Sequence, residues 1–374
     1  MFRNTPHKFL LAVVSTLSLA YGFIRIHEQV TAQKDQPNSA THSDRPVELV
    51  WKNIQVLKGV PKSQFPRSMD FMTAALGVDC DYCHVSAWES DDKPAKQVTR
   101  KMILMMREIN DKNFNGKPVV NCATCHQGHP KPPAEPPLDQ VALRSRFTQP
   151  SMKPDATATL PSVDSIIDRY VEALGGKSAF EKLNTRFIKS TLSTGDGKTA
   201  SQEVYMKAPH KAVFITTTGT ETTSYGFSGT TGWLKTSRVR RELSGPLLDQ
   251  LRFNSEFNRE IRFKELFIEL RVVGKEKIGT REVYVVEAKP SYSDPRRFYF
   301  DVETGLLLRT LIEETSILGS MLDQLDFSDY RSVNGIKLPF QIQRTSLWEN
   351  SVTKIVELKH NVPVSDTKFE LPAQ

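Results

Sequence analysis

The chain has 374 residues, of which 39% are hydrophobic and 25% are charged. That apolar share is enough for packed cores and too high for a disordered chain, and the length predicts two domains with appendages. A mean hydropathy of -0.39 and the lack of a long apolar run beyond residue 24 exclude a protein that crosses a membrane several times. The net charge of +7 is small, and no run of five or more Lys and Arg occurs, so nucleic-acid binding is not predicted.

Residues 1–32 have the pattern of an export signal. Arg3, His7 and Lys8 form a basic start, and an uncharged, mostly apolar run follows over residues 9–24. This run is longer than a typical signal core and shorter than the ~20 residues of a full membrane span. A cleaved signal peptide and an uncleaved signal anchor therefore both remain open. In either case we expect the rest of the chain to lie in the periplasm.

Two helices rich in methionine are predicted next. Residues 62–76 place Met69, Met72 and Leu76 on one apolar face, and Gly77 supplies a helix stop. A second helix is predicted over residues 94–110, where one apolar face carries Val98, Met102, Met105 and Ile109.

All four cysteines of the chain lie in two C-x-x-C-H motifs, at residues 80–84 and 122–126. This motif is the attachment signature of c-type haem, in which two thiols form thioethers to the porphyrin and the histidine binds the iron. The predicted thioether residues are Cys80, Cys83, Cys122 and Cys125, and the predicted proximal iron ligands are His84 and His126. Disulfides, a thioredoxin-like redox pair and a Cys/His zinc site are the competing interpretations. The histidine directly after each pair, and the lack of a βαβ pattern, favour two covalently bound haem c groups.

The sixth iron ligand decides what such a haem does, because a filled position leaves only electron transfer. Spacing alone leaves two kinds of ligand open. One is a methionine of the preceding helix, although methionine on a helix usually fills a core. The other is a histidine from elsewhere in the chain, with His129 and His42 nearest in sequence.

Residues 69–84 and 100–128 resemble the cytochrome c subunit of photosynthetic reaction centres, a family built from repeats of helix, turn and C-x-x-C-H. In that family the distal ligand of most haems is a methionine on the preceding helix. The resemblance therefore implies Met69 and Met102 as distal iron ligands, and Met72 and Met105 as packing residues. The family carries four haems, whereas this chain has attachment sites for two.

The resemblance implies a periplasmic dihaem electron carrier whose redox partner lies at the membrane face, such as a reaction centre or another electron-transfer complex. No catalytic acid–base residues can be assigned. The alternatives are a haem enzyme, a peroxidase or reductase, with one open iron position, and a lipid- or lipoprotein-binding protein with accessory haems. Arg67, Arg100 and Arg107 are candidates to pair with haem propionates, and ordinary solvated helix positions explain them equally well.

The remaining chain is predicted to contain a spacer and a second domain, so the proposed boundaries are 1–32, 43–129, 130–161 and 162–374. Residues 130–161 are proline-rich and read as a semi-rigid linker. A helix is expected after an N-cap at Ser162, a capping box at residues 178–181 is expected to begin a short second helix, and residues 247–270 are read as a helical insertion. Strands are expected at residues 203–207, 211–217, 222–227, 282–287, 297–301, 306–312, 336–345 and 352–359.

The predicted fold class is therefore α+β and multidomain, with a small α-helical dihaem domain followed by a curved antiparallel β-sheet or open β-barrel with helices. Residues 225–229, 297–301 and 303–309 make the second domain similar to the outer-membrane lipoprotein carrier fold. That resemblance implies an acyl or lipid ligand for this domain. A docking module that positions the cytochrome is the alternative.

One prediction follows from the assignment of Met102. Replacing this residue with alanine removes the thioether, which favours ferrous iron, so Met102→Ala is expected to open or re-ligate the second haem and lower its midpoint potential. A redox titration followed by optical spectra measures both effects. Unchanged spectra and an unchanged potential would remove Met102 from the set of iron ligands.

Overall fold

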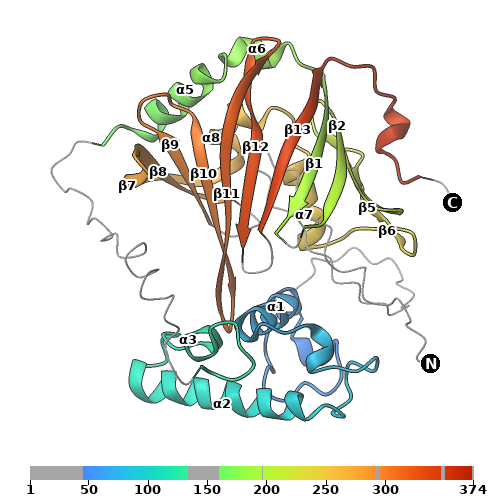
Figure 1. The fold of residues 1–374 in the computed structure, drawn as a ribbon, viewed down its shortest axis with the longest axis vertical. Coiled ribbons are helices and arrows are strands. Elements are labelled where there is room, and N and C mark those ends of the chain that lie inside the picture. The colour runs from blue at the N-terminus through green and yellow to red at the C-terminus, as the bar shows by residue number, and fades with distance from the viewer. Residues whose placement is uncertain (1–44, 134–159, 196, 291–294, 347–349, 373–374) are drawn as a thin grey trace. The chain divides into compact units, whose positions relative to one another are not determined.

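The computed structural model describes residues 45–133, 160–195, 197–290, 295–346 and 350–372 (Figure 1). The predicted export signal, His42 and most of the predicted linker lie outside the described residues. Two compact units are present. The helical unit comprises the described residues within Ala32–Ser151 together with Glu313–Leu322, and the sheet unit comprises those within Met152–Ile312 and Asp323–Gln374. Among the described residues, no helix has the length and apolar character needed to cross a membrane.

The helical unit contains the two predicted methionine-rich helices. Helix α1 ends at Gly77, whose left-handed backbone (φ 66°) suits glycine because that conformation costs a residue with a Cβ. Helix α2 begins with Pro94 and continues past residue 110 to a left-handed Asn115. The helical segments are η1 (Val47–Leu49), η2 (Lys62–Gln64), α1 (Phe65–Leu76), η3 (Cys80–Tyr82), α2 (Pro94–Phe114) and α3 (Cys122–His126).

The helix faces that form the core are not the faces predicted from apolar periodicity. Helix α1 buries Ser68, Phe71 and Ala75. Helix α2 buries Ile103, Met106 and Asn110. The predicted stripes therefore lie beside the packed faces, and the stripe of α2 is largely exposed.

The sheet unit contains one open antiparallel sheet of 13 strands, which confirms the predicted fold class. The strands follow one another as neighbours except that β1 pairs with β13, and β6 and β7 form the two edges. The strands are β1 (Thr185–Thr194), β2 (Thr199–Lys207), β3 (Lys211–Thr218), β4 (Glu221–Phe227), β5 (Gly232–Lys235), β6 (Arg240–Glu242), β7 (Phe267–Ile278), β8 (Arg281–Pro290), β9 (Arg296–Asp301), β10 (Leu307–Ser316), β11 (Gly319–Val333), β12 (Ile336–Ser346) and β13 (Asn350–His360).

Helices cover part of this sheet. The Ser162 hydroxyl accepts a hydrogen bond from the backbone N–H of Ser165, which confirms the predicted N-cap. The predicted capping box at residues 178–181 is wrong, because the short helix begins earlier and its N-cap is Gly176, which has no side chain to cap it. The predicted helical insertion is helical only up to Leu266, and β7 begins at the next residue. The helical segments are α5 (Val163–Ala173), α6 (Lys177–Glu181), α7 (Pro246–Asn254), η4 (Arg259–Ile261), α8 (Phe263–Leu266) and η5 (Asp366–Phe369).

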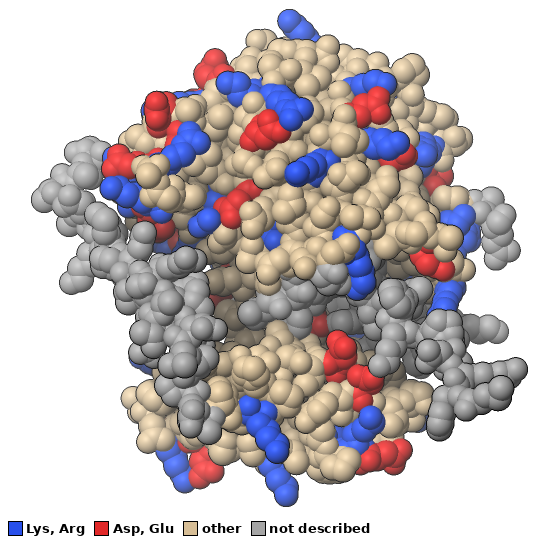
Figure 2. Space-filling view, viewed as in Figure 1, with Lys and Arg blue, Asp and Glu red and all other residues tan. Residues whose placement is uncertain are grey.

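The main core lies between one face of the sheet and helices α5, α7 and α8. Tyr170 of α5, Phe253 of α7 and Phe263 of α8 belong to the same buried cluster as inward residues of the strands such as Phe298 and Phe300. Burial of this apolar surface is what holds the helices on the sheet. On the face of the unit drawn in Figure 2, basic and acidic side chains are interspersed.

Candidate haem sites

The first motif is wound into a single tight turn. The N–H of Cys83 donates to the Cys80 carbonyl at 3.3 Å, and the N–H of His84 donates to the same carbonyl at 3.0 Å. The 3-10 turn η3 thereby brings two thiols, three residues apart, to the same side of the chain. The histidine follows directly, so the two thiols and the imidazole lie within one turn.

The second motif forms the short helix α3, whose start is fixed by a capping box. Asn121 Oδ1 accepts from the Thr124 N–H at 3.1 Å, and Thr124 Oγ1 accepts from the Asn121 N–H at 3.1 Å. A helix of five residues has little intrinsic stability, so these two bonds hold the turn that carries the thiols. The helix ends at Gln127 and Gly128, both with positive φ.

Each motif histidine is oriented by a backbone carbonyl. His84 Nδ1 lies 3.0 Å from the carbonyl oxygen of Trp88, and His126 Nδ1 lies 2.9 Å from the carbonyl oxygen of His129. A carbonyl oxygen only accepts hydrogen bonds, so Nδ1 carries the proton in both rings and the lone pair is on Nε2. This arrangement presents Nε2 to a metal and fixes the ring. Burial also lowers the pKa of His84, which keeps that ring neutral.

The cysteines are not arranged for the competing chemistries. All four are free thiols. Burial raises the pKa of Cys80, Cys83 and Cys122, so these groups are thiols and not thiolates at neutral pH. Within the described residues, no group of three or more His, Cys, Asp and Glu side chains is placed to hold a metal ion.

The exposed stripe of α2 is an apolar surface that a bound apolar group would cover. Met102 is 36% exposed, Met105 is 46% exposed and Val98 is 53% exposed. Three large apolar side chains on one helix face are costly to leave in water, and a porphyrin face would cover them. Met69 and Met72 of α1 are half-buried. The assignment of Met69 and Met102 as distal ligands stays a prediction.

The helical unit also contains an open hollow of about 470 Å³ beside both motifs. It is lined by Tyr82 of the first motif and by His129, Pro130, Lys131 and Pro133, which follow the second motif. His129 contributes its carbonyl to the fixing of His126, and its ring is exposed. Sequence reasoning singled out His129 as a ligand candidate and missed the role of its backbone.

Two glycines bring the motifs into contact. The N–H of Gly128 donates to the Ala75 carbonyl at 2.9 Å. A Cβ on Gly77 would lie 2.0 Å from the carbonyl oxygen of Gly128, so only glycine permits this approach. The turn before the first motif therefore rests on the turn after the second.

A buried asparagine fixes the chain that leads into the second motif. Asn110 Nδ2 donates to the Val120 carbonyl at 2.7 Å, and Asn110 Oδ1 accepts from the Val120 N–H at 2.9 Å. The amide thereby replaces a strand partner for Val120. Nothing in the sequence indicated that Asn110 would bind the backbone of Val120, because no pattern distinguishes this asparagine from other polar helix residues.

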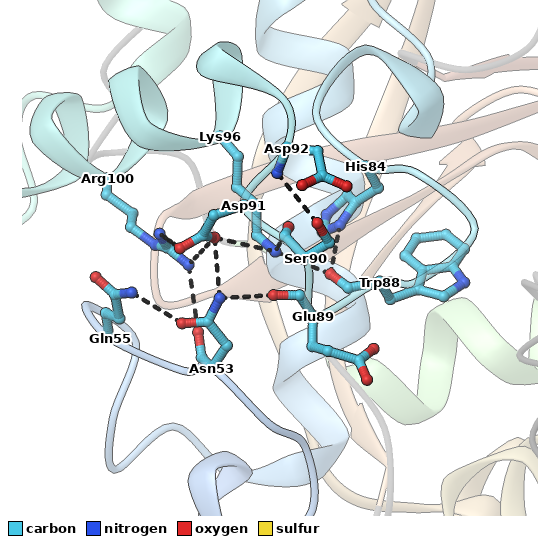
Figure 3. Close-up of polar contacts among 10 residues, drawn as sticks. All are labelled: Asn53, Gln55, His84, Trp88, Glu89, Ser90, Asp91, Asp92, Lys96 and Arg100. Atoms are coloured by element: carbon cyan, nitrogen blue, oxygen red, sulfur yellow. Dashed lines mark hydrogen bonds and ion pairs between the residues drawn. The ribbon is translucent and has the colours of Figure 1, made fainter.

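A polar network joins the loop after the first motif to helix α2 (Figure 3). Asp91 accepts hydrogen bonds from Arg100 and Asn53 at 2.9 Å, and Lys96 lies 3.6 Å from the same carboxylate. The hydrogen bond from Arg100 is the largest cause that lowers the pKa of Asp91 to about 2. Arg107 Nη1 donates to the Val56 carbonyl at 2.6 Å. Arg100 and Arg107 thus bind groups of the protein itself, whereas they were proposed to pair with propionates.

The part of the chain that carries the two motifs and their fixed histidines is also the part that is similar to known cytochromes. Residues 22–156 match the family model described as the photosynthetic reaction centre cytochrome C subunit, which confirms the resemblance expected from the sequence. The chain is 39% identical over 88 residues to the photosynthetic reaction center cytochrome c subunit of Thermochromatium tepidum, an alignment that covers 22% of each chain. It is 32% identical over 126 residues to cytochrome c-554 of Chloroflexus aurantiacus, covering 28% of this chain and 30% of that one. The chain thus spans less than a third of these relatives.

The sheet unit is similar to solved structures of low sequence identity. A LolA superfamily protein from Nitrosomonas europaea is 12% identical with a TM-score of 0.41, and the match covers 56% of this chain and 98% of that one. A DUF1329 family protein from Desulfovibrio piger is 14% identical with a TM-score of 0.41, covering 56% and 97%. The strand topology of the chain itself, rather than these likenesses, defines its fold.

The contact between the two turns gives a testable prediction. In Gly77→Ala the new methyl group meets the Gly128 carbonyl, so we expect the free energy of unfolding of the helical unit to fall by about 3 kcal/mol. Denaturant unfolding of the full-length protein, followed by haem absorption, measures the change.

Gly59→Ala is the matched control, because Gly59 also has positive φ (80°) but nothing lies within 4 Å of its added Cβ. We expect it to cost only the backbone strain, about 1 kcal/mol. Equal losses in the two variants would contradict the proposed role of the turn contact.

Proposed function

We propose that the chain is a periplasmic c-type cytochrome that carries single electrons on two covalently attached haems. The observation that carries this proposal is the state of the two motif histidines. His84 and His126 each donate Nδ1–H to a backbone carbonyl, one turn after a pair of free thiols. A disulfide pair or a thioredoxin-like site has no need of this arrangement, whereas a haem iron does.

The residues that would hold the haems are those of the two motifs and the helices before them. Cys80, Cys83, Cys122 and Cys125 would form the thioethers, His84 and His126 would bind iron on the proximal side, and Met69 and Met102 would bind it on the distal side. When bound, haem supplies one-electron transfer between ferric and ferrous iron.

The chain's own contribution is to hold these groups rigidly. The capping box at Asn121, the Asn110 amide and the Asp91 network each fix a segment next to a motif. A rigid surrounding suits electron transfer, because little has to rearrange when the charge on iron changes. The contact between Gly77 and Gly128 keeps the two motifs in one unit, which favours transfer between two neighbouring haems.

The proposed location follows from the export pattern of residues 1–32. The proposed partner is a redox protein at the periplasmic face of the membrane. The relatives from Thermochromatium tepidum and Roseobacter denitrificans are photosynthetic reaction center cytochrome c subunits. A reaction centre or another electron-transfer complex is therefore the class of partner that we infer.

The test is the intact mass and the carbon monoxide reactivity of the exported protein. We expect the mass of two haems above that of the processed chain, and one haem fewer when Cys122 and Cys125 are both replaced by serine. We expect no binding of carbon monoxide to the reduced protein, because both sixth positions are filled. A colourless protein would overturn the proposal, and rapid carbon monoxide binding would favour the alternative haem enzyme.

We propose a second function for the sheet unit, the binding of an amphiphile with an anionic head. Its interior is lined by aromatic rings such as Phe253 and Phe298. The same wall carries the buried side chains of Arg259, Arg296 and Glu260, so its two cationic groups exceed its one carboxylate. Apolar walls with a few cationic groups suit such a ligand. The cavity is only about 40 Å³, which is room for little more than a water molecule, so entry of an acyl chain requires the covering side chains to move.

Adjacent arginines of β9 allow a matched test. Arg296 is buried on the cavity side, whereas Arg297 is exposed on the other face of the strand. We expect delipidated protein to take up a fluorescent fatty-acyl probe, Arg296→Met to weaken binding about tenfold, and Arg297→Met to leave it unchanged. Circular dichroism checks that both variants fold. No uptake by the delipidated wild type would refute this function.

A further inference from the structure

One carbonyl oxygen next to the first haem site serves two donors. The Trp88 carbonyl accepts from His84 Nδ1 at 3.0 Å and from Lys96 Nζ at 2.9 Å (Figure 3). Lys96 Nζ also donates to the Ser90 carbonyl at 2.7 Å, and its side chain is only 13% exposed. The Lys96 ammonium group is therefore fixed against the carbonyl oxygen that orients His84.

The second site has the same histidine bond without the cation. His126 Nδ1 lies 2.9 Å from the His129 carbonyl. Within the described part of the chain, no lysine or arginine donates to that carbonyl. The two sites thus differ in whether a cation shares the carbonyl that orients the motif histidine. At the first site, Lys96 shares the carbonyl that accepts from His84.

A cation bound to a carbonyl oxygen draws electron density from it and makes it a weaker acceptor. His84 then keeps more of its Nδ1 proton and donates less electron density to iron. A weaker donor favours ferrous over ferric iron, and a nearby positive charge has the same effect because it repels the more positive oxidation state. Both effects raise the reduction potential.

The neighbouring charges leave this effect in place. Asp91 is the carboxylate nearest to Lys96, at 3.6 Å, but it also forms an ion pair with Arg100 at 2.9 Å. Two cations therefore share this one anion, and both act electrostatically on His84. Asn53 adds a neutral donor to Asp91 and no charge.

We propose that Lys96 raises the reduction potential of the first haem above that of the second by sharing the Trp88 carbonyl with His84. This inference rests on the proposed function. Lys96 is a positioning residue, since it acts on iron through His84 and Trp88.

The test is a redox titration of the exported holoprotein followed by haem absorption. In Lys96→Gln we expect the equilibrium constant for one-electron reduction of the first haem to fall about tenfold, a shift of about 59 mV to lower potential, with the second haem unchanged. The variant without Cys122 and Cys125 identifies which transition belongs to the first haem. We expect Lys96→Arg, which keeps the charge, to retain the potential.

Lys101→Gln is the control, because Lys101 lies on the same helix, is exposed and gives the same change in net charge. We expect it to shift neither transition measurably, since exposed charges are screened by solvent and salt. Proton NMR of the reduced protein gives a readout apart from potential. The His84 Nδ1 proton is expected to move downfield in Lys96→Gln, because the Trp88 carbonyl becomes a better acceptor.

The following outcomes distinguish the role of Lys96 from the cytochrome function. An unchanged potential in haem-loaded Lys96→Gln, or equal shifts in Lys96→Gln and Lys101→Gln, would overturn the proposal while leaving the cytochrome function intact. Should Lys96→Gln fail to incorporate haem, Asp91→Asn is the second variant. It removes the anion that offsets Lys96, so the first haem is expected to rise in potential, and a fall or no change would count against the proposal. Wild-type protein without haem would instead refute the proposed function.

Discussion

The hydrogen bond from a motif histidine to a backbone carbonyl is the interaction on which the helical unit depends. It decides which ring nitrogen carries the proton, and so leaves Nε2 as the nitrogen available to bind a metal at His84 and at His126. The surrounding structure is arranged to supply those two carbonyls at the right place. The loop that carries Trp88 is bonded to helix α2 through Lys96, and the turn that carries His129 leaves a helix held by its capping box.

The two helices before the motifs were predictable, because their apolar periodicity and end signals are displayed by a single sequence, whereas the haem-binding roles of the motif residues stay predictions. The packed faces of the helices were not predictable. Apolar periodicity identified the stripe that includes Met102, whereas the core uses Ile103 and Met106. A sequence cannot tell an apolar face that packs against protein from one that is kept for a cofactor. The hydrogen bond between His84 Nδ1 and the Trp88 carbonyl could not be predicted either, because every residue has a backbone carbonyl and the sequence does not mark which one is used.

The sheet illustrates a second limit. Eight strands were predicted, but β1, β5, β6, β7 and β11 were not. In β11, Asp323 interrupts the inward apolar residues of the strand. The buried Arg344 on β12 forms a two-point ion pair with this carboxylate at 2.8 and 2.7 Å, which makes its inward position tolerable. Strand β7 was read as helix, since it is an edge strand whose exposed side carries charged residues.

The pairing of β1 with β13 has a consequence for how the protein is made. These strands are the first and last of the sheet, and they are joined along most of their length. The sheet therefore cannot be completed until β13 has been synthesised, and its long-range pairing is a slow step. The helical unit also includes Glu313–Leu322, where β10 ends and β11 begins, so it too is completed only after most strands of the sheet have been made. Both units therefore depend on the late part of the chain.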